Sequence, residues 1–194
     1  GRLFDMTEIM MACYVEPQTI ELLLQKCTEF IKKYCLELKK VGANGVVIAE
    51  PAAGLLSNDD CLKFATPYLK EIIEAVQDES FIVVLHNCGN TGHCTQSMVA
   101  TGAWAQHFGN KIDMVKALED TPSEMLVMGN LDPVALFKVA SPAEMKAATV
   151  ELLERTKDYN NFVLSSGCDT PPEVPAANIA AFYGALDEFN ANRA

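Results

Sequence analysis

The sequence has no apolar run long enough to cross a bilayer. The longest runs, such as Phe81 to Leu85, have the length of a buried strand, whereas a transmembrane helix needs about 20 apolar residues. The first residues also lack the basic segment followed by an apolar segment that marks a secretory signal. We therefore expect a cytoplasmic protein without a membrane partner.

Clusters of basic residues are missing as well. The chain has 15 lysines and arginines against 26 aspartates and glutamates, which gives a formal net charge of −11. Nucleic acids and anionic membrane surfaces are bound by concentrated positive charge, so neither is an expected partner. A small molecule or another protein fits this composition better.

Low-complexity tracts, internal repeats and linker-like stretches are absent, so residues 1–194 are expected to form a single domain. A hydrophobic content of 49% is sufficient for a buried core. The seven cysteines are an odd number without regular spacing, and most lie in helical patterns, which indicates reduced thiols rather than disulfides. Some of these thiols are therefore available to bind a metal.

The chain does contain a regular alternation of strand and helix patterns. Apolar runs of strand length predict strands at Gly45–Ala49, Phe81–Leu85, Trp104–Phe108, Met125–Met128 and Phe162–Ser165. Helical periodicity and capping signals predict helices at Pro17–Val41, after Asn58 with a break at Pro67, Ile112–Leu118, Pro133–Val139, Ser141 to about Lys157, and Pro175–Phe189. About five β/α units result, and their continuous apolarity predicts a parallel sheet with helices on both faces.

The residues that follow the strands distinguish a barrel from an open sheet. Polar or metal-binding side chains follow every predicted strand, from Glu50 after the first to Cys168 after the last. In a β/α barrel all these strand ends surround one active-site face, whereas an open doubly wound sheet concentrates its chemistry at one switch point. We therefore expect part of an eight-stranded barrel, with about three upstream units outside this chain.

His86 and Cys88 form the most specific local motif, since an imidazole and a thiol at the end of a buried strand can bind a metal together. A hydrogen-bonded histidine beside a buried cysteine would give the same pattern. Cys168, in a loop with glycine and proline, is the candidate third ligand. The alternative is a local zinc knuckle that adds His93 and Cys94, although these adjacent residues fit tetrahedral geometry poorly.

Several segments, in the same order, resemble the C-terminal half of the uroporphyrinogen decarboxylase superfamily. They are His86-Asn-Cys-Gly-Asn90, Gly129-Asn-Leu-Asp-Pro133, Ser166-Gly-Cys-Asp169 and Pro172-Glu-Val-Pro-Ala-Ala-Asn178. The superfamily's decarboxylases carry a histidine where this chain has Cys168, so the cysteines resemble instead its methylcobalamin:coenzyme M methyltransferases and their bacterial relatives. The resemblance implies an α/β fold, a (β/α)8 TIM barrel to which this chain contributes about five C-terminal units, with Zn²⁺ held by His86, Cys88 and Cys168.

The same resemblance implies a methyltransferase that moves a methyl group between a corrinoid and a thiol or pterin acceptor. Three protein ligands leave one zinc position for a substrate thiol, which binds as the nucleophilic thiolate. The chain lacks an Asp-x-His-x-x-Gly corrinoid-binding signature, so the cobalamin is expected on a separate corrinoid protein or as free cobalamin. The rest of the barrel, or a second copy of the chain, is a further expected partner. A tetrapyrrole decarboxylase and a non-catalytic zinc- or corrinoid-binding module are the alternatives.

Two residues at strand ends are candidates for catalytic roles. Glu50 is expected to be a fourth zinc ligand or the carboxylate that orients His86. His107 is expected to bind the methyl acceptor or to handle its proton. For both residues a purely structural role is the competing interpretation.

Three residues at other strand ends are candidates for binding the corrinoid cofactor: Asn90, Asn130 and Asp169. Asn130 and the residues after it are also expected to brace the strand end and cap the next helix. Asp169 is also expected to support one of the metal ligands.

Overall fold

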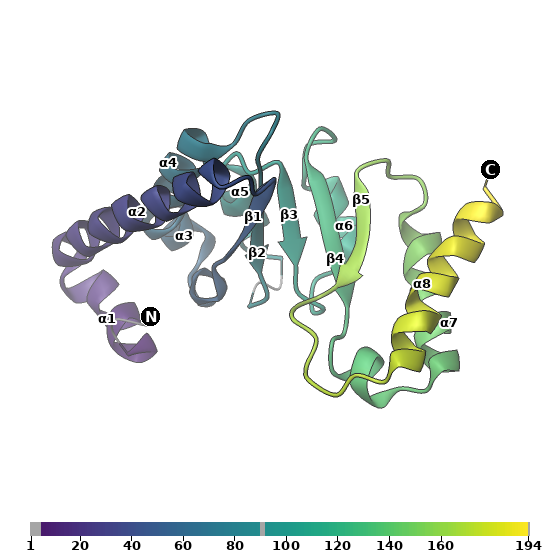
Figure 1. The fold of residues 1–194 in the computed structure, drawn as a ribbon. Helices are drawn as coiled ribbons and strands as arrows, with labels where there is room; N and C mark the ends of the chain where they lie inside the picture. Colours follow the sequence, from purple (N-terminus) through teal and green to yellow (C-terminus); the bar gives the residue numbers. More distant parts are fainter. Residues whose placement is uncertain (1–4, 90–91, 194) are drawn as a thin grey trace.

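The computed structural model describes residues 5–89 and 92–193. They form one parallel sheet and the helices that pack against it (Figure 1). Its five strands are β1 (Gly45–Ala49), β2 (Ile82–Asn87), β3 (Ala105–Phe108), β4 (Leu126–Leu131) and β5 (Phe162–Ser166). They are hydrogen-bonded in the order in which they occur in the chain. Consecutive order is the arrangement of a β/α barrel, whereas a doubly wound sheet reverses direction at its switch point.

Helices connect the strands. The longer ones are α1 (Met6–Val15), α2 (Pro17–Lys40), α4 (Thr66–Val76), α7 (Pro142–Thr156) and α8 (Ala176–Ala191). The shorter ones are α3 (Asn58–Phe64), α5 (Thr95–Val99), α6 (Met114–Glu119), the 3₁₀-helix η1 (Pro51–Leu55) and the π-helix η2 (Ala135–Val139). The predicted strands and helices are confirmed, with ends that differ by a few residues. The sequence patterns did not predict α1, η1 and α5, because these elements are short or lack a distinct apolar stripe.

Local capping explains where several helices begin. Ser141 accepts a hydrogen bond from the main-chain N–H of Glu144, whose carboxylate accepts one from the N–H of Ser141, so the predicted capping box starts α7. The Ser57 hydroxyl caps α3 by accepting from the main-chain N–H of Asp60. Helices α3 and α4 are separated at Ala65, because a helix is broken near a proline such as Pro67.

The strand side chains alternate between a helix-covered face and an open face. On the helix-covered face Val83, Leu85 and Val127 are at most 2% exposed and belong to the main core. On the open face Val47 is 65% exposed, and no element of the described residues covers it. The prediction of helices on both faces is therefore wrong for this part of the chain. The strands of a barrel curve around their own interior, so helices cover only its outside.

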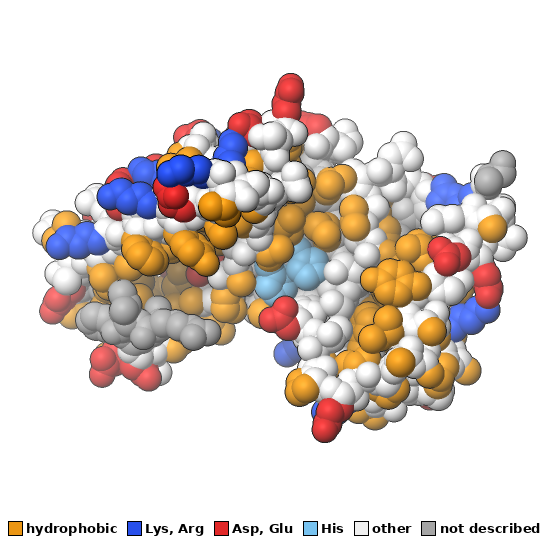
Figure 2. Space-filling view, in the orientation of Figure 1, with side chains coloured by type: hydrophobic (Ala, Val, Ile, Leu, Met, Phe, Trp, Pro, Cys, Tyr) orange, Lys and Arg blue, Asp and Glu red, His pale blue; other side chains and the backbone are white. Residues whose placement is uncertain are grey.

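The open face forms a hollow with histidines at its centre (Figure 2). Hydrophobic side chains lie beside these histidines, and the hollow is lined by Val47, Ala49, Val84, His86, His107, Met128, Ser165, Ser166, Cys168, Asp169 and Thr170. The C-terminal ends of β2, β3 and β5 therefore meet in one concave region. This is the region where a β/α barrel carries its active site.

Helix α2 is only partly buried. Ile20, Thr28 and Cys35 are buried, and α2 packs against α4. Ile31 and Tyr34, which belong to the helical apolar pattern of the sequence, are 37% and 59% exposed, so this pattern is wider than the surface that the described elements cover. Within the described residues, no helix is long and apolar enough to cross a membrane.

Candidate metal centre

The end of β2 presents His86 and Cys88 on the same side of the sheet. Side chains in a strand alternate between its faces, so residues two apart point in the same direction. His86 is paired in register with Ala49 of β1 and with His107 of β3, and all three line the open hollow. The His-x-Cys spacing therefore places the Cys88 side chain on the same side of the sheet as His86, where one ligand atom of each lies within 4.8 Å of the other.

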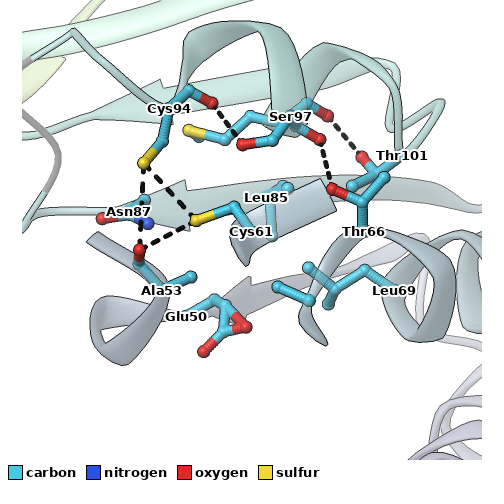
Figure 3. A pocket seen from close by; sticks show the side chains of 12 residues that line it. Glu50, Ala53, Cys61, Thr66, Leu69, Leu85, Asn87, Cys94, Ser97 and Thr101 are labelled. Atoms are coloured by element: carbon cyan, nitrogen blue, oxygen red, sulfur yellow. Dashed lines mark hydrogen bonds between the residues drawn. The ribbon is translucent and has the colours of Figure 1, made fainter. Parts of the chain in front are cut away.

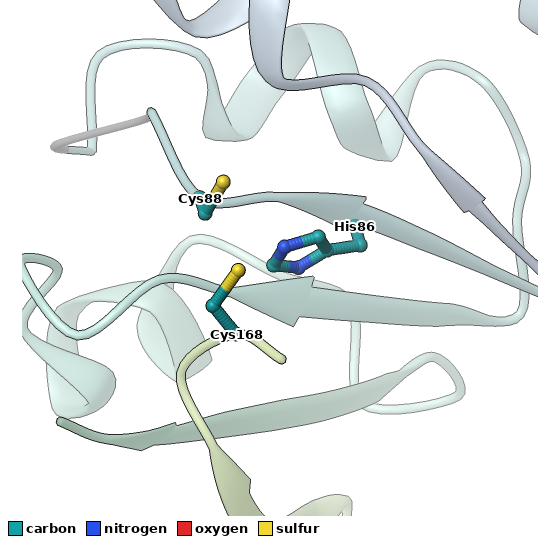
Figure 4. A group of neighbouring side chains, drawn as sticks. All are labelled: His86, Cys88 and Cys168. Carbon is teal, nitrogen blue, oxygen red and sulfur yellow. The ribbon is translucent and has the colours of Figure 1, made fainter. Parts of the chain in front are cut away.

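Cys168 approaches the same point from the loop after β5. One possible ligand atom each from His86, Cys88 and Cys168 lies within 4.8 Å of the others, as Figure 4 illustrates. Cys168 is 80 residues further along the chain than Cys88, so the parallel sheet, rather than a local loop, brings the two thiols together. The structure thus places the three residues predicted as ligands in one group.

The hydrogen bonds of His86 leave one ring nitrogen available. Its Nδ1 lies 3.3 Å from the main-chain oxygen of His107, to which the Nδ1–H tautomer donates. Its Nε2 is buried and has no hydrogen-bond partner among the described residues. A buried nitrogen without a partner is costly, and a histidine that donates from one nitrogen to a carbonyl while presenting the other is the usual arrangement of a metal ligand.

The protonation of the group also suits a cation. Burial lowers the pKa of His86 below its ordinary value of 6.5, despite the opposing effects of the His107 carbonyl and Asp169, so the ring is neutral at pH 7. Burial is likewise the main cause that raises the pKa of Cys88, and the neighbouring Cys168 contributes further. Without a cation, therefore, burial favours the protonated thiol of Cys88 beside a neutral imidazole, and a positive ion would favour the thiolate form of Cys88.

His107 contacts both sides of the hollow. Its ring lies 4.6 Å from the ring of His86, centroid to centroid. Its Nε2 lies 2.8 Å from the main-chain oxygen of Ser166 and 3.2 Å from the Ser165 hydroxyl, so Nε2–H donates to β5. Burial lowers the pKa of His107, which keeps this ring neutral as well. His107 is therefore fixed between β2 and β5 and has a definite tautomer.

Glu50 does not join this group, contrary to the prediction that it is a fourth ligand or orients His86. Ala49 shares the open face with His86, so the next side chain points toward the helices. There Glu50 lines a pocket with Ala53, Cys61 and other residues between the sheet and α3, α4 and α5 (Figure 3). The carbonyl of His107 takes the orienting role that the sequence assigned to this carboxylate.

Replacing Glu50 by glutamine is expected to stabilise the protein at pH 7.5 and to have no effect at pH 4. Burial raises the pKa of Glu50 above its unfolded value, so folding favours the protonated carboxyl. The cost of the buried charge is absent below the unfolded pKa and reaches its full size above the folded pKa. Glutamine removes the charge but keeps an oxygen that can accept from the main chain of Ala53.

The measurement is the melting temperature of both proteins between pH 4 and 7.5, with Glu124→Gln as a control at an exposed position. Equal effects of the two substitutions at all pH values would show that the burial of Glu50 carries no such cost.

The three residues predicted to bind the corrinoid differ in their surroundings. The Asn130 side-chain amide donates to the carbonyls of Gly109 and Ile112, at 2.9 and 2.8 Å, so it braces the loop after β3 as expected. Asp132 accepts from the N–H groups of Val134 and Ala135, just before and at the start of η2. The exposed Asp169 lines the hollow. Its negative charge raises the pKa of His86 and His107 and so works against the lowering by burial. Asn90 lies outside the described residues.

The alternative zinc knuckle is not formed, because His93 and Cys94 point to the helix-covered side. The Nε2 atom of His93 lies 3.0 Å from the main-chain oxygen of Leu56. The Cys94 sulfur lies 3.5 Å from the sulfur of Cys61, and both residues are at most 2% exposed. Within the described residues, only His86, Cys88 and Cys168 form a group of metal-ligand size.

Sequence reasoning missed the supporting contacts of this group. Ser165 and Ser166 bind the His107 ring, and the Ser166 hydroxyl donates to the main-chain oxygen of Cys168 at 2.7 Å. Gly109 packs directly on Cys88, so a Cβ atom at this position would lie 2.7 Å from the Cys88 oxygen. The adjacent serines and the glycine two residues after His107 were the available signals, but only tertiary structure shows what they contact.

Fold and site together define a class of protein: part of a parallel β/α barrel with a histidine and two thiols gathered where the strands end. The chain belongs to the uroporphyrinogen decarboxylase (URO-D) family, whose profile matches residues 2–189. The resemblance seen in the sequence is thereby confirmed.

The relatives include two kinds of enzyme. The chain is 30% identical over 181 residues to "Methylcobamide:CoM methyltransferase MtbA" of Methanosarcina acetivorans, covering 92% of the chain and 49% of the relative. It is also 30% identical over 184 residues to "Uroporphyrinogen decarboxylase" of Chlorobaculum parvum, covering 92% and 51%. The chain thus spans about half the length of the curated relatives it matches, and overall identity does not separate the two activities.

A solved "methyltransferase from Methanosarcina mazei" has the same fold. It aligns with a TM-score of 0.86 at 27% sequence identity, covering 97% of this chain and 55% of the other. This similarity confirms the barrel-type fold predicted from the polar residues after the strands and from the family resemblance.

Proposed function

We propose that His86, Cys88 and Cys168 together hold one zinc ion. Zinc prefers nitrogen and sulfur donors, and this group offers a neutral imidazole nitrogen and two thiols. The unpartnered Nε2 of His86 supports the proposal most directly, because its other nitrogen is held by a main-chain carbonyl as in known histidine–zinc sites. We place the protein in the cytoplasm, where both thiols stay reduced.

On this basis the chain would be the metal-binding part of a methyltransferase that moves a methyl group between a corrinoid and a thiol or pterin acceptor. The relatives named methylcobamide:CoM methyltransferases support this choice. Zinc held by three protein ligands supplies an open position at which a substrate thiol loses its proton near neutral pH. The corrinoid would arrive on a partner protein or as free cobalamin, and the open face would be covered by further barrel strands or a second copy of the chain.

The chain's own residues would orient the reaction. His86 is held through Nδ1, which leaves Nε2 available for an ion shared with the two sulfurs. His107 donates from Nε2 to the Ser166 carbonyl. Its Nδ1 is therefore the ring atom that could take a proton from the thiol or pterin that receives the methyl group. Val47, Val84 and Met128 provide an apolar wall beside these polar groups. Asp169, which lines the hollow, and Asn130 remain candidates for contact with the corrinoid.

The lining of the hollow favours this activity over tetrapyrrole decarboxylation. A substrate with several carboxylates is usually bound by arginine or lysine. Among the described residues, the hollow is lined by neither, and Asp169 adds a negative charge. A corrinoid and a single thiol require less positive charge from the protein.

Methyl transfer can be measured with the zinc-loaded chain and with any longer natural polypeptide that contains it. Methylcobalamin is offered with coenzyme M or with tetrahydrofolate, and the methylated product is detected by mass spectrometry. The proposal predicts a methylated thiol or pterin. Turnover of uroporphyrinogen without methyl transfer would instead identify a decarboxylase, and the absence of both activities would favour a binding module.

Zinc itself is expected to stabilise the protein. A ligand that binds only the folded state adds about 2.7 kcal/mol to the free energy of unfolding when its free concentration is 100 times Kd. Thermal melting with buffered zinc should therefore show a higher Tm, which excess chelator reverses. Magnesium is the matched control because it prefers oxygen ligands, and an equal effect of both ions would contradict a nitrogen and sulfur site.

A further inference from the structure

The loop that carries Cys168 has little secondary structure to hold it. Strand β5 ends at Ser166, and no helix or strand follows until α8 begins at Ala176. Asp169 and Thr170 are exposed. His86, in contrast, lies within β2 and is only 7% exposed. The position of the Cys168 sulfur relative to His86 therefore depends on a few contacts at the start of the loop.

Two hydrogen bonds hold the main chain at the start of the Cys168 loop. The Gly167 N–H donates to the carbonyl of Leu131 at 2.7 Å, which attaches the loop to β4. The Ser166 hydroxyl donates to the carbonyl of Cys168 at 2.7 Å, which closes a turn around Gly167. The first bond fixes the beginning of the loop, and the second fixes the residue that carries the thiol.

The same serine is connected to His86 through His107. The carbonyl of Ser166 accepts from Nε2 of His107 at 2.8 Å, and the carbonyl of His107 lies 3.3 Å from Nδ1 of His86. A continuous series of contacts therefore runs from the His86 ring, through both ends of His107, to Ser166 and the main chain of Cys168. It joins two of the proposed ligands across β2, β3 and β5.

We propose that Ser166 is a positioning residue, whose hydroxyl holds the Cys168 thiol in place for metal binding while its carbonyl fixes the ring of His107. This inference rests on the proposed zinc site and concerns how that site is built. Loss of an outer contact of this kind typically weakens metal binding by about 10–100-fold. Ser166 does not itself touch the metal in this account.

The test is the zinc affinity of the wild-type chain and of Ser166→Ala, measured by competition with a chromogenic chelator. The alanine variant should bind zinc about 10–100-fold more weakly. Ser166→Thr keeps a hydroxyl and should restore most of the affinity. Ser123→Ala is the matched control, because Ser123 is exposed and does not line the hollow.

Two further readouts separate positioning from a general loss of structure. With cobalt(II) in place of zinc, the sulfur-to-cobalt absorption of Ser166→Ala should be weaker than in wild type, and that of Ser166→Thr should match wild type. In the metal-free chain, iodoacetamide should alkylate Cys168 several-fold faster in Ser166→Ala, with no change at Cys88. This second measurement needs no bound metal.

The outcomes distinguish this inference from the proposed function. If the wild-type chain binds no zinc, both the zinc site and the positioning role are overturned. If wild type binds zinc and Ser166→Ala matches it within twofold, with the same cobalt spectrum, only the positioning role is overturned. The same conclusion follows if threonine and alanine at this position weaken binding equally.

Discussion

Replacing Cys168 by serine is expected to reduce the zinc content of the purified protein from about one equivalent to near zero. A serine hydroxyl is a poor zinc ligand at neutral pH, so the ion would keep only His86 and Cys88 from the chain. Loss of a direct ligand should exceed the roughly 10–100-fold effect that loss of an outer contact causes. Zinc is measured by elemental analysis after dialysis against buffer with a low concentration of chelator.

The control is Cys94→Ser, because the sulfur of Cys94 contacts Cys61 rather than the proposed ligands. This variant should keep its zinc, and Cys27→Ser, at a half-buried position in α2, should keep it as well. If Cys94→Ser loses the metal while Cys168→Ser retains it, the ion is bound by residues that follow β2, as in the zinc knuckle. The proposed site, which joins the ends of β2 and β5, would then be wrong.

Gly109→Ala is expected to weaken zinc binding and to lower the free energy of unfolding by about 1–3 kcal/mol. The added Cβ would lie 2.7 Å from the main-chain oxygen of Cys88 and 2.9 Å from its Cα atom. These are backbone atoms, so the clash cannot be relieved by a side-chain rotation. Because the contact is with Cys88 itself, the substitution should displace a proposed ligand without removing its thiol.

Gly184→Ala in α8 provides the matched comparison, because nothing lies within 4 Å of the Cβ position. Alanine at this helical position should stabilise the protein by roughly 0.5–1 kcal/mol and leave zinc binding unchanged. Chemical denaturation gives the stabilities, and chelator competition gives the affinities. A Gly109→Ala variant as stable as wild type and with the same zinc affinity would show that Cys88 does not need its present position.

Much of the framework could be predicted because it depends on short-range patterns. The apolar runs located the strands, and the capping box at Ser141 located the start of α7. The two-residue spacing of His86 and Cys88 placed them on one side of β2, since strand geometry alone decides this. Cys168 could be grouped with them because parallel strands of a barrel all end on the same face.

Other features depend on contacts that the sequence does not encode locally. Glu50 follows its strand as closely as a ligand would, yet the alternation of faces turns it toward the helices. The sequence could not show that the carbonyl of His107, rather than a carboxylate, would orient His86, because any residue supplies a carbonyl. The open face was also missed, since an apolar run does not reveal whether helices or other strands cover each side.

The most direct test of the account is X-ray absorption at the zinc edge of the zinc-loaded protein. Ligation by His86, Cys88 and Cys168 predicts two sulfur atoms at about 2.3 Å and one imidazole nitrogen at about 2.0 Å, with one further light atom or substrate sulfur completing the shell. In Cys168→Ser any residual bound zinc should show one sulfur fewer. A shell of oxygen and nitrogen alone in the wild-type protein would contradict the proposed centre and the methyl transfer inferred from it.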